Sequence, residues 1–408
     1  GKRGAQLDFE AVFLVRVQRS QGAGEMLHAQ AVLGPVATGL GQPVEPALPT
    51  PAPLTSLPDY EQQARQHIEA SAWQHIQGGA DQQHTLAHNR AAFDALRLLP
   101  QPLADFSAAH TRQTLLGQPL EHPILLAPVA YQTLAHPEGE LASVRAATAL
   151  QAGMVASTLS SHTLEAIAHE AQHARSALQR RGPLWFQLYS QAKRQHTLEL
   201  VQRAESAGYE AIVWTVDASI KRSGFALPAG VQAANLRHIA PRPQASSIDG
   251  PPLFGTPLAQ QAPRWDELRW LRAHTRLPLV VKGVLHPAQA RQLVDVGVDA
   301  LIISNHGGRV LDGVVSPLEV LPAIAQAVHV PLLLDSGVRW GTDVVKALAL
   351  GASAVLVGRP QLHALACAGW LGVAHMLHLL RSELELAMAQ LGCATLADIG
   401  PGIFWKNS

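Results

Sequence analysis

The feature that most constrains this chain is an alternation of short apolar runs with amphipathic helical stretches, repeated eight times from Pro123 onward. The apolar runs are nearly continuous, which is typical of strands in a parallel sheet covered by helices on both faces. They read PILLAPV, MVAST, LWFQLY, AIVWTVD, PLVVKG, ALIISNH, PLLLDSG and AVLVGRP. Eight βα units over roughly 250 residues predict an α/β fold of the closed (β/α)8 type, a TIM barrel.

An open doubly wound sheet is the alternative, but it would need an early glycine-rich dinucleotide turn, and no GxGxxG occurs. Before the repeats, the stretches DYEQQARQHIEASAWQHI and QHTLAHNRAAFDAL predict an N-terminal helical cap. Residues 1–56 are rich in Gly, Ala, Gln and Pro and have no regular period, so we expect a disordered arm. The predicted domains are this arm and one barrel domain at 57–408.

Composition limits the partners. Lys+Arg and Asp+Glu both number 31, so no net field favours nucleic acid or an anionic membrane, and we expect a small-molecule ligand. The two cysteines, Cys367 and Cys393, exclude a disulfide framework or a zinc cluster, so no metal is expected. They fit a cytoplasmic protein. A loop of about 45 residues after Asp217 predicts a lid or mobile insertion, and peripheral membrane association through it stays open.

Polar residues gather at the ends of the predicted strands, where the active sites of TIM barrels lie. They are Ser157, Gln187, Tyr189, Thr215, Asp217, Lys282, Ser304, His306, Arg309, Asp335, Arg339 and Arg359. Near the last two strands, the amides of Gly337, Gly341 and Gly358 could meet Arg339 or Arg359 around a dianion. This pattern predicts a phosphate site, against ordinary turn glycines and surface arginines.

Four of these residues suggest chemistry. Lys282 ends an apolar strand, so its ammonium must meet an anion or reach water. Arg309 offers a planar fork that suits a carboxylate, and the two glycines before it allow a flat ligand to approach. His306 is a candidate base, which Asp217 could orient and stabilise when protonated.

Six stretches, SNHGGRVLD, LPLVVKGV, RWGTDVVKALALGA, LAHPEGE, FQLY and TVD, resemble the FMN-dependent α-hydroxy acid oxidases and dehydrogenases. This family includes glycolate oxidase, lactate oxidase and mandelate dehydrogenase, and the resemblance runs from about Asp59 to Ile399. It implies oxidation of an L-2-hydroxy acid to the 2-oxo acid, with the flavin reoxidised by oxygen, a quinone or another acceptor. It also implies a homotetramer.

The resemblance further implies a role for each matching position. Tyr189 would bind the substrate hydroxyl and Arg309 its carboxylate, while His306 and Asp217 would form the acid/base pair. Whether His306 takes the α-proton or the hydroxyl proton is left open. Lys282 would lie by N1 of the flavin, and Asp335 would bind the ribityl chain. The phosphate would be bound by Gly337, Arg339, Gly358 and Arg359. The implied FMN-binding residues are Pro128, Val129, Ala130, Ser157, Gln187, Thr215, Lys282, Ser304, Asp335, Gly337, Arg339, Gly358 and Arg359.

The chain departs from the family pattern at four positions. Gly224 stands where the family has a second carboxylate-binding arginine, and the nearest cation is Arg222. His75 replaces an active-site tyrosine, which makes one substrate contact dependent on pH. Leu159 replaces a bulky aromatic, so substrates that are lactate-like or longer are expected, and Ser336 replaces a glycine. These departures keep open a flavin-binding protein with weak or lost turnover, and a barrel isomerase is a further alternative.

Overall fold

The computed structural model describes residues 54–220, 227–239 and 253–405. Most of the predicted arm, residues 1–53, lies outside this part of the chain, as do Arg222 and Gly224. The first helix begins at Leu57 and is capped by the side chain of Ser56, which accepts from the N–H of Asp59.

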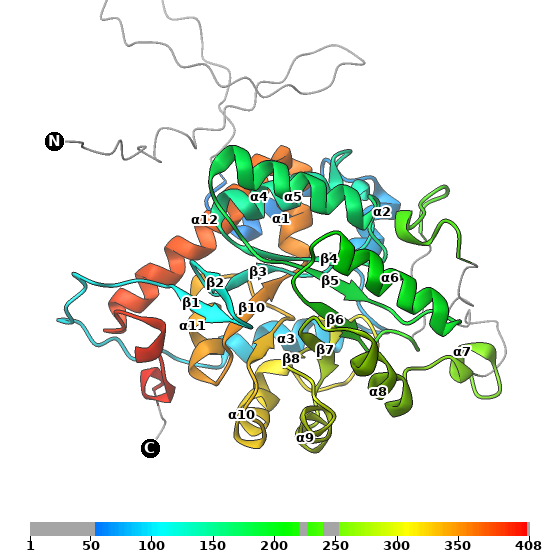
Figure 1. The fold of residues 1–408 in the computed structure, drawn as a ribbon. Helices are drawn as coiled ribbons and strands as arrows, with labels where there is room; N and C mark the ends of the chain where they lie inside the picture. The colour runs from blue at the N-terminus through cyan, green and yellow to red at the C-terminus, as the bar shows by residue number, and fades with distance from the viewer. Residues whose placement is uncertain (1–53, 221–226, 240–252, 406–408) are drawn as a thin grey trace, which may run out of the picture. The chain divides into compact units, whose positions relative to one another are not determined.

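Eight parallel strands close into a barrel in the order β10-β3-β4-β5-β6-β7-β8-β9 (Figure 1). Each strand falls within one of the eight predicted apolar runs or extends beyond it by one residue, so the predicted TIM barrel is confirmed and the open-sheet alternative is excluded. The strands are β3 (Ile124–Leu126), β4 (Gly153–Ser157), β5 (Leu184–Leu188), β6 (Ile212–Thr215), β7 (Leu279–Val284), β8 (Ala300–Ile303), β9 (Leu332–Leu334) and β10 (Ala354–Val357).

Helices surround the strands and cover the outer face of the barrel (Figure 1), while apolar side chains of the strands fill its interior. The helices of the βα units are α4 (Gly139–Leu150), α5 (Leu164–Leu178), α6 (Arg194–Ser206), α8 (Trp265–His274), α9 (Pro287–Asp295), α10 (Pro317–Ala327), α11 (Gly341–Ala349) and α12 (Arg359–Gln390), with the short α7 (Pro257–Gln260) before α8. Five 3-10 turns are described as well: η2 (Gln132–Leu134), η3 (Ala234–Leu236), η4 (His306–Gly308), η5 (Leu396–Asp398) and η6 (Pro401–Ile403).

Three helices precede the barrel: α1 (Leu57–Ala64), α2 (Ala70–Gln77) and α3 (His84–Asp94). The first predicted helical stretch is therefore broken between α1 and α2. A new helix starts there because the Glu69 side chain accepts from the backbone N–H of Ser71 (3.3 Å) and so acts as an N-cap.

A two-stranded hairpin closes the N-terminal end of the barrel, and it was not predicted. Strands β1 (Gln113–Leu115) and β2 (Gln118–Leu120) are joined by a turn with positive φ at both central residues, as in a type I′ hairpin. Leu115 and Leu120 pack into the barrel core. Three-residue strands carry too little alternation to be recognised in a sequence, and the opposite end of the barrel is left for chemistry.

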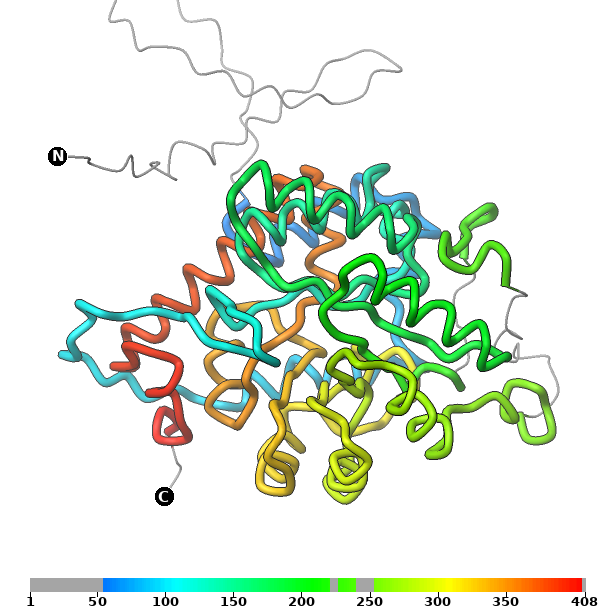
Figure 2. The backbone as a smooth tube through the Cα atoms, in the orientation of Figure 1, coloured from blue at the N-terminus to red at the C-terminus, as the bar shows by residue number. Residues whose placement is uncertain are grey.

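The last described residues lie beside the segment that follows helix α3. The N–H of Leu99 donates to the carbonyl of Ile403 (2.8 Å), and the N–H of Trp405 donates to that of Arg97 (2.9 Å), so 97–99 run beside 403–405 (Figure 2). Helix α12 is interrupted at Ala368 and Gly369. It is the one helix of the described residues that is long and apolar enough to cross a membrane, but 56% of the relevant window is buried inside the fold.

Candidate active site

The ammonium of Lys282 lies near the C-terminal end of strand β7. Its Nζ donates to Oγ of Ser304 (2.8 Å) and pairs with Oδ2 of Asp335 (2.9 Å), and the residue is 4% exposed. Burial acts to lower the pKa of Lys282, but the charges of Asp335 and Asp217 outweigh it and raise the pKa above its usual value. A permanent positive charge is therefore held at the end of β7, with carboxylates on either side.

His306 and Asp217 form the predicted pair across the same opening. Nδ1 of His306 lies 3.0 Å from Oδ1 of Asp217. Because a carboxylate only accepts, Nδ1 carries the hydrogen, and Nε2 is the nitrogen that can take a proton from a substrate. Burial acts to raise the pKa of Asp217, but His306 and Lys282 together hold it below its usual value. Asp217 is thus an anion that favours the protonated imidazole.

A glycine makes room for this pair. Gly283 has φ +102°, and a Cβ there would lie 2.5 Å from Cγ of Asp217. The pairing register of β7 with β8 shifts between Lys282 and Val284, as at a β-bulge. Sequence reasoning missed this residue, although a glycine directly after a lysine inside an apolar strand is a signal of close backbone approach.

Two of the three predicted anion-binding arginines that the structure describes, Arg309 and Arg359, contact the C-terminal end of α2. Arg309 donates from Nη1 to the carbonyls of Ile76 (3.0 Å) and Gly78 (2.8 Å), and from Nη2 to that of His75 (2.7 Å). Arg359 donates to the same carbonyls of Ile76 and Gly78 (both 3.0 Å). A guanidinium has five N–H donors, so each arginine keeps donors for an anion. The α2 carbonyls were not foreseen, because the sequence carries no signal for a backbone acceptor.

The predicted phosphate end is strongly positive. Burial, with the charges of Arg309 and Arg339, lowers the pKa of Arg359, and burial lowers that of Arg339. Such a cluster is short of negative charge and favours a dianion. Arg90 binds the loop between β9 and α11: its Nη1 donates to the carbonyl of Gly337 and to Asp343 (both 2.6 Å).

Gly341 has a different use from the one expected. Its N–H donates to Oε2 of Glu383 (2.7 Å), and a Cβ there would lie 2.2 Å from the backbone nitrogen of Leu384. The residue is therefore a glycine because α11 packs closely on α12, and its amide is not offered to a phosphate.

Buried polar atoms near Lys282 lack hydrogen-bond partners among the described residues, which is expected where a flat polar ligand binds. Nε2 of Gln187 and Oγ1 of Thr215 are buried without a hydrogen-bond partner among the described residues, and both lie at strand ends. Unpaired buried groups of this kind point to a missing partner. With Lys282 beside them and the arginine cluster beyond, the residues fit FMN, whose ring edge accepts and donates hydrogen bonds and whose phosphate is a dianion.

The comparison with known proteins decides the family. A family model described as FMN-dependent dehydrogenase matches residues 64–406. The chain belongs to the FMN-dependent dehydrogenase family. It is 52% identical to an L-lactate oxidase of Alicycliphilus denitrificans over 84% of this chain and 93% of that protein, and 45% identical to an L-lactate oxidase of Nostoc sp. over 84% and 95%. A crystal structure of mandelate oxidase with (S)-2-phenylpropionate is 40% identical, with a TM-score of 0.74 over 85% of this chain and 96% of that one.

Ser336 and His75, two of the residues predicted to depart from the family pattern, lie in the part of the chain that the structure describes. Ser336 has φ +76°, and its Oγ accepts from the N–H of Gly307 (3.0 Å) and donates to Asp335 (2.8 Å). The serine thus ties the end of β9 to the loop of His306. The ring of His75 lies edge-on to that of Tyr131, with centroids 6.4 Å apart.

Proposed function

We propose that this protein oxidises an L-2-hydroxy acid to the 2-oxo acid with bound FMN and passes the electrons to oxygen. The observation that carries the proposal is the grouping of a carboxylate-buttressed imidazole, His306 with Asp217, beside a buried ammonium, Lys282, at one end of the barrel. An isomerase would not need this base together with the guanidinium of Arg309.

The roles follow from the chemistry of the groups. Arg309 binds the substrate carboxylate with the donors that the α2 carbonyls leave, and Tyr189, close enough to interact with the charge of Arg309, binds the hydroxyl. His306 takes a proton at Nε2, and Asp217 stabilises the resulting imidazolium. When bound, FMN supplies the acceptor for the two electrons that leave the substrate. Lys282 offers a positive charge to the ring, and Asp335, which it holds in place, binds the ribityl chain.

The remaining flavin contacts are assigned from the strand ends. The isoalloxazine would be held by backbone after β3 and by side chains of β4, β5 and β6, and the phosphate by the glycines and arginines after β9 and β10. These residues are Pro128, Val129, Ala130, Ser157, Gln187, Thr215, Ser304, Gly337, Arg339, Gly358 and Arg359.

A lactate-like or longer substrate is supported by two observations. Leu159 gives a smaller wall than the aromatic that it replaces, and the relatives at 52% and 45% identity are named L-lactate oxidases. Oxygen as acceptor is supported by the same names. The homotetramer, the cytoplasmic location and the substrate contacts of His75 and Arg222 stay predictions.

Anaerobic mixing of the holoenzyme with a hydroxy acid tests the function. We expect L-lactate to bleach the yellow flavin absorbance. Readmitted air should restore this absorbance in no more time than one catalytic cycle takes. Glycolate and L-mandelate, mixed in the same way, rank the preferred side chain. Bound FMN that none of these acids reduces would contradict the proposal and favour a flavin-binding protein without turnover.

His306→Gln tests the assigned base. The variant should retain FMN, because His306 is not among the residues assigned to hold it, and flavin reduction by L-lactate should slow by at least about 100-fold, the usual effect of removing a general base. Stopped-flow reduction kinetics measure this. An unchanged reduction rate would remove His306 from the mechanism.

A further inference from the structure

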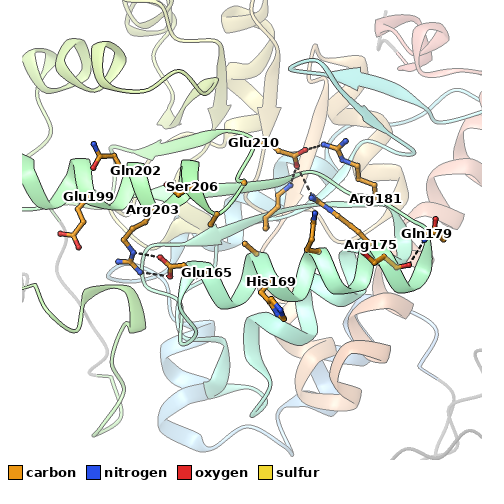
Figure 3. Close-up of a pocket in the computed structure, with 16 residues that line it drawn as sticks. Glu165, His169, Arg175, Gln179, Arg181, Glu199, Gln202, Arg203, Ser206 and Glu210 are labelled. Atoms are coloured by element: carbon orange, nitrogen blue, oxygen red, sulfur yellow. Dashed lines mark hydrogen bonds and ion pairs between the residues drawn. The ribbon is translucent and has the colours of Figure 1, made fainter.

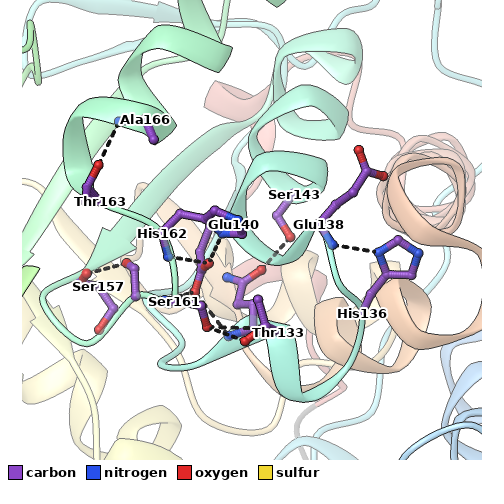
Figure 4. Close-up of polar contacts among 12 residues, drawn as sticks. Thr133, His136, Glu138, Glu140, Ser143, Ser157, Ser161, His162, Thr163 and Ala166 are labelled. Atoms are coloured by element: carbon purple, nitrogen blue, oxygen red, sulfur yellow. Dashed lines mark hydrogen bonds and ion pairs between the residues drawn. The ribbon is translucent and has the colours of Figure 1, made fainter. Parts of the chain in front are cut away.

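A buried carboxylate at the start of α4, that of Glu140, joins two loops at the C-terminal end of the barrel (Figure 4). The residue is 0% exposed. Oε1 accepts from the backbone N–H of Gln132 (3.1 Å) and Ser161 (2.9 Å). Oε2 accepts from the backbone N–H of His162 (3.3 Å) and from its Nδ1 (3.0 Å). Donors from two separate loops therefore converge on one side chain.

Glu140 is more than a cap of its own helix. A carboxylate in the first turn usually accepts from the N–H groups of that turn. Within the described part of the chain, the groups that donate to Glu140 belong to Gln132, Ser161 and His162, which all lie outside α4. The side chain instead points across to the β3–α4 loop, 127–138, and the β4–α5 loop, 158–163.

The two loops also bond to each other directly. The N–H of Tyr131 donates to the carbonyl of Leu159 (3.0 Å), and Oγ1 of Thr133 lies 2.8 Å from Oγ of Ser161. Burying a charge is costly unless its hydrogen bonds are complete. The buried carboxylate is therefore stable only when both loops donate their hydrogen bonds to it. Glu140 thus holds the two loops together.

Hydrogen bonds connect these two loops to the residues assigned to the flavin. On one side, Nε2 of Gln132 donates to Oε1 of Gln361 (3.4 Å), and Nε2 of Gln361 donates to the carbonyl of Ala127 (2.9 Å), next to Pro128. On the other side, the N–H of Leu159 donates to Oγ of Ser157 (3.1 Å). The first chain of hydrogen bonds begins at Gln132, which donates to Glu140, and the second begins at Leu159, whose carbonyl accepts from the N–H of Tyr131, the residue before Gln132.

We propose that Glu140 is a positioning residue, which fixes the β3–α4 and β4–α5 loops so that the backbone after β3 and Ser157 meet the flavin ring and Leu159 and Tyr131 shape the substrate pocket. The inference rests on the proposed function for its substrate half. Its flavin half requires only that FMN binds at this end of the barrel.

Glu140→Gln in the holoenzyme is the test. Each oxygen of Glu140 accepts at least one backbone N–H, so either orientation of the new amide sets an NH2 group against a donor. We expect the FMN dissociation constant, measured by flavin fluorescence on dilution, to rise about tenfold. The KM for L-lactate should rise several-fold while kcat falls less, because His306 and Asp217 are carried by other strands. The visible circular dichroism of the bound flavin should change as well.

Glu210→Gln is the matched control. Glu210 lies in an open groove between α5 and α6, at the N-terminal ends of β5 and β6, where it pairs with Arg175 and Arg181 (Figure 3). It also accepts the backbone N–H of Leu184 (2.8 Å). The control variant loses a similar set of bonds far from the flavin, so it should be less stable to heat but keep the wild-type FMN dissociation constant and KM.

The outcomes separate clearly. A folded Glu140→Gln protein with wild-type FMN affinity, KM and flavin dichroism would overturn the proposal, and so would equal effects in the two variants. If hydroxy acids fail to reduce even the wild-type flavin, the proposed function has failed, while the FMN affinity and dichroism still report on Glu140.

Discussion

At the scale of single residues, the site depends on backbone that few residue types tolerate. His306 itself has φ +58°, and Gly307 and Gly308 follow with φ +64° and +72°. A histidine in the left-handed region is uncommon, and such strain persists where the surroundings enforce it. Here the bond from Nδ1 to Asp217 and the bond from the N–H of His306 to Oγ of Ser304 (3.0 Å) hold the residue in place.

Gly283→Ala should displace Asp217. The new Cβ would lie 2.5 Å from Cγ of Asp217, which is too close for any relaxed contact. We expect flavin reduction to slow about 10- to 100-fold, the usual result of moving a catalytic group by about 1 Å. Stopped-flow reduction measures the rate.

Gly297→Ala supplies the control for that substitution. Gly297 has a similar φ, +96°, but its Cβ would meet only Arg272, at an ordinary 3.6 Å. Both variants share the backbone strain, so they should lose similar stability, and only Gly283→Ala should lose activity. Equal reduction rates in the two would show that the contact with Asp217 does not matter.

At the scale of elements, helix α3 supports the loop that carries the base. The carboxylate of Asp312 accepts from the N–H groups of His84 (3.2 Å) and Thr85 (2.7 Å), so it caps α3 from a distant part of the chain. The side chains of Asn89 and Asn305 exchange two hydrogen bonds (3.0 and 2.7 Å). The segment from Asn305 to Asp312 is thus fixed to α3 at both ends.

Asp312→Ala should loosen this attachment. Its hydrogen bonds to Thr85 and His84 lower the pKa of Asp312 to about 2, which means that the anion is the capping form at neutral pH. We expect faster hydrogen exchange in the first turn of α3 and a KM for L-lactate that is about fivefold higher, because Arg309 lies in the attached segment. Asp295→Ala, an exposed aspartate at the end of α9, should change neither measurement. Slow exchange retained at Thr85 would contradict the capping role.

At the scale of the whole molecule, the fold buries neutral histidines that limit its stability in acid. His122 is 0% exposed, its Nε2 donates to the carbonyl of Leu150 (3.0 Å), and its Nδ1 accepts from the N–H of Ile124 (3.3 Å). Burial, with the charge of Arg381, lowers its pKa to about 4. Burial, with the charges of Arg339 and Arg359, lowers the pKa of His363 to about 3.

Acid should therefore destabilise the protein before its carboxylates titrate. The unfolded chain binds a proton at His122 near pH 6.5 and the folded chain only near pH 4, so stability is complete above pH 6.5 and is lost as the pH falls toward 4. The loss from this residue is on the order of 3 kcal/mol. Urea unfolding at pH 7.5 and pH 4.5 measures it, and His122→Gln, whose amide can make both hydrogen bonds, should show a smaller difference. The same difference in both proteins would exclude His122 as the cause.

The barrel was predictable because its strands are buried on both faces and so read as continuous apolar runs. The polar residues at strand ends were predictable for a related reason: Lys282 and Asp335 have no packing role in such runs. The hydrogen bonds from Arg309 to the end of α2 were not predictable, because their acceptors are backbone carbonyls, which every residue has. Glu140 was visible in LAHPEGE, but nothing in the sequence tells which distant N–H groups a buried carboxylate will collect.

The carbonyls of Ile76 and Gly78 each accept from both Arg309 and Arg359. When an anion binds one guanidinium, the hydrogen bonds from that guanidinium to the two carbonyl oxygens change, and so do the hydrogen bonds that these oxygens accept from the other guanidinium. Cofactor loading and substrate affinity should then obey reciprocal thermodynamic linkage, so that hydroxy acid and flavin mononucleotide influence each other's occupancy through a turn of main chain that touches neither reacting atom.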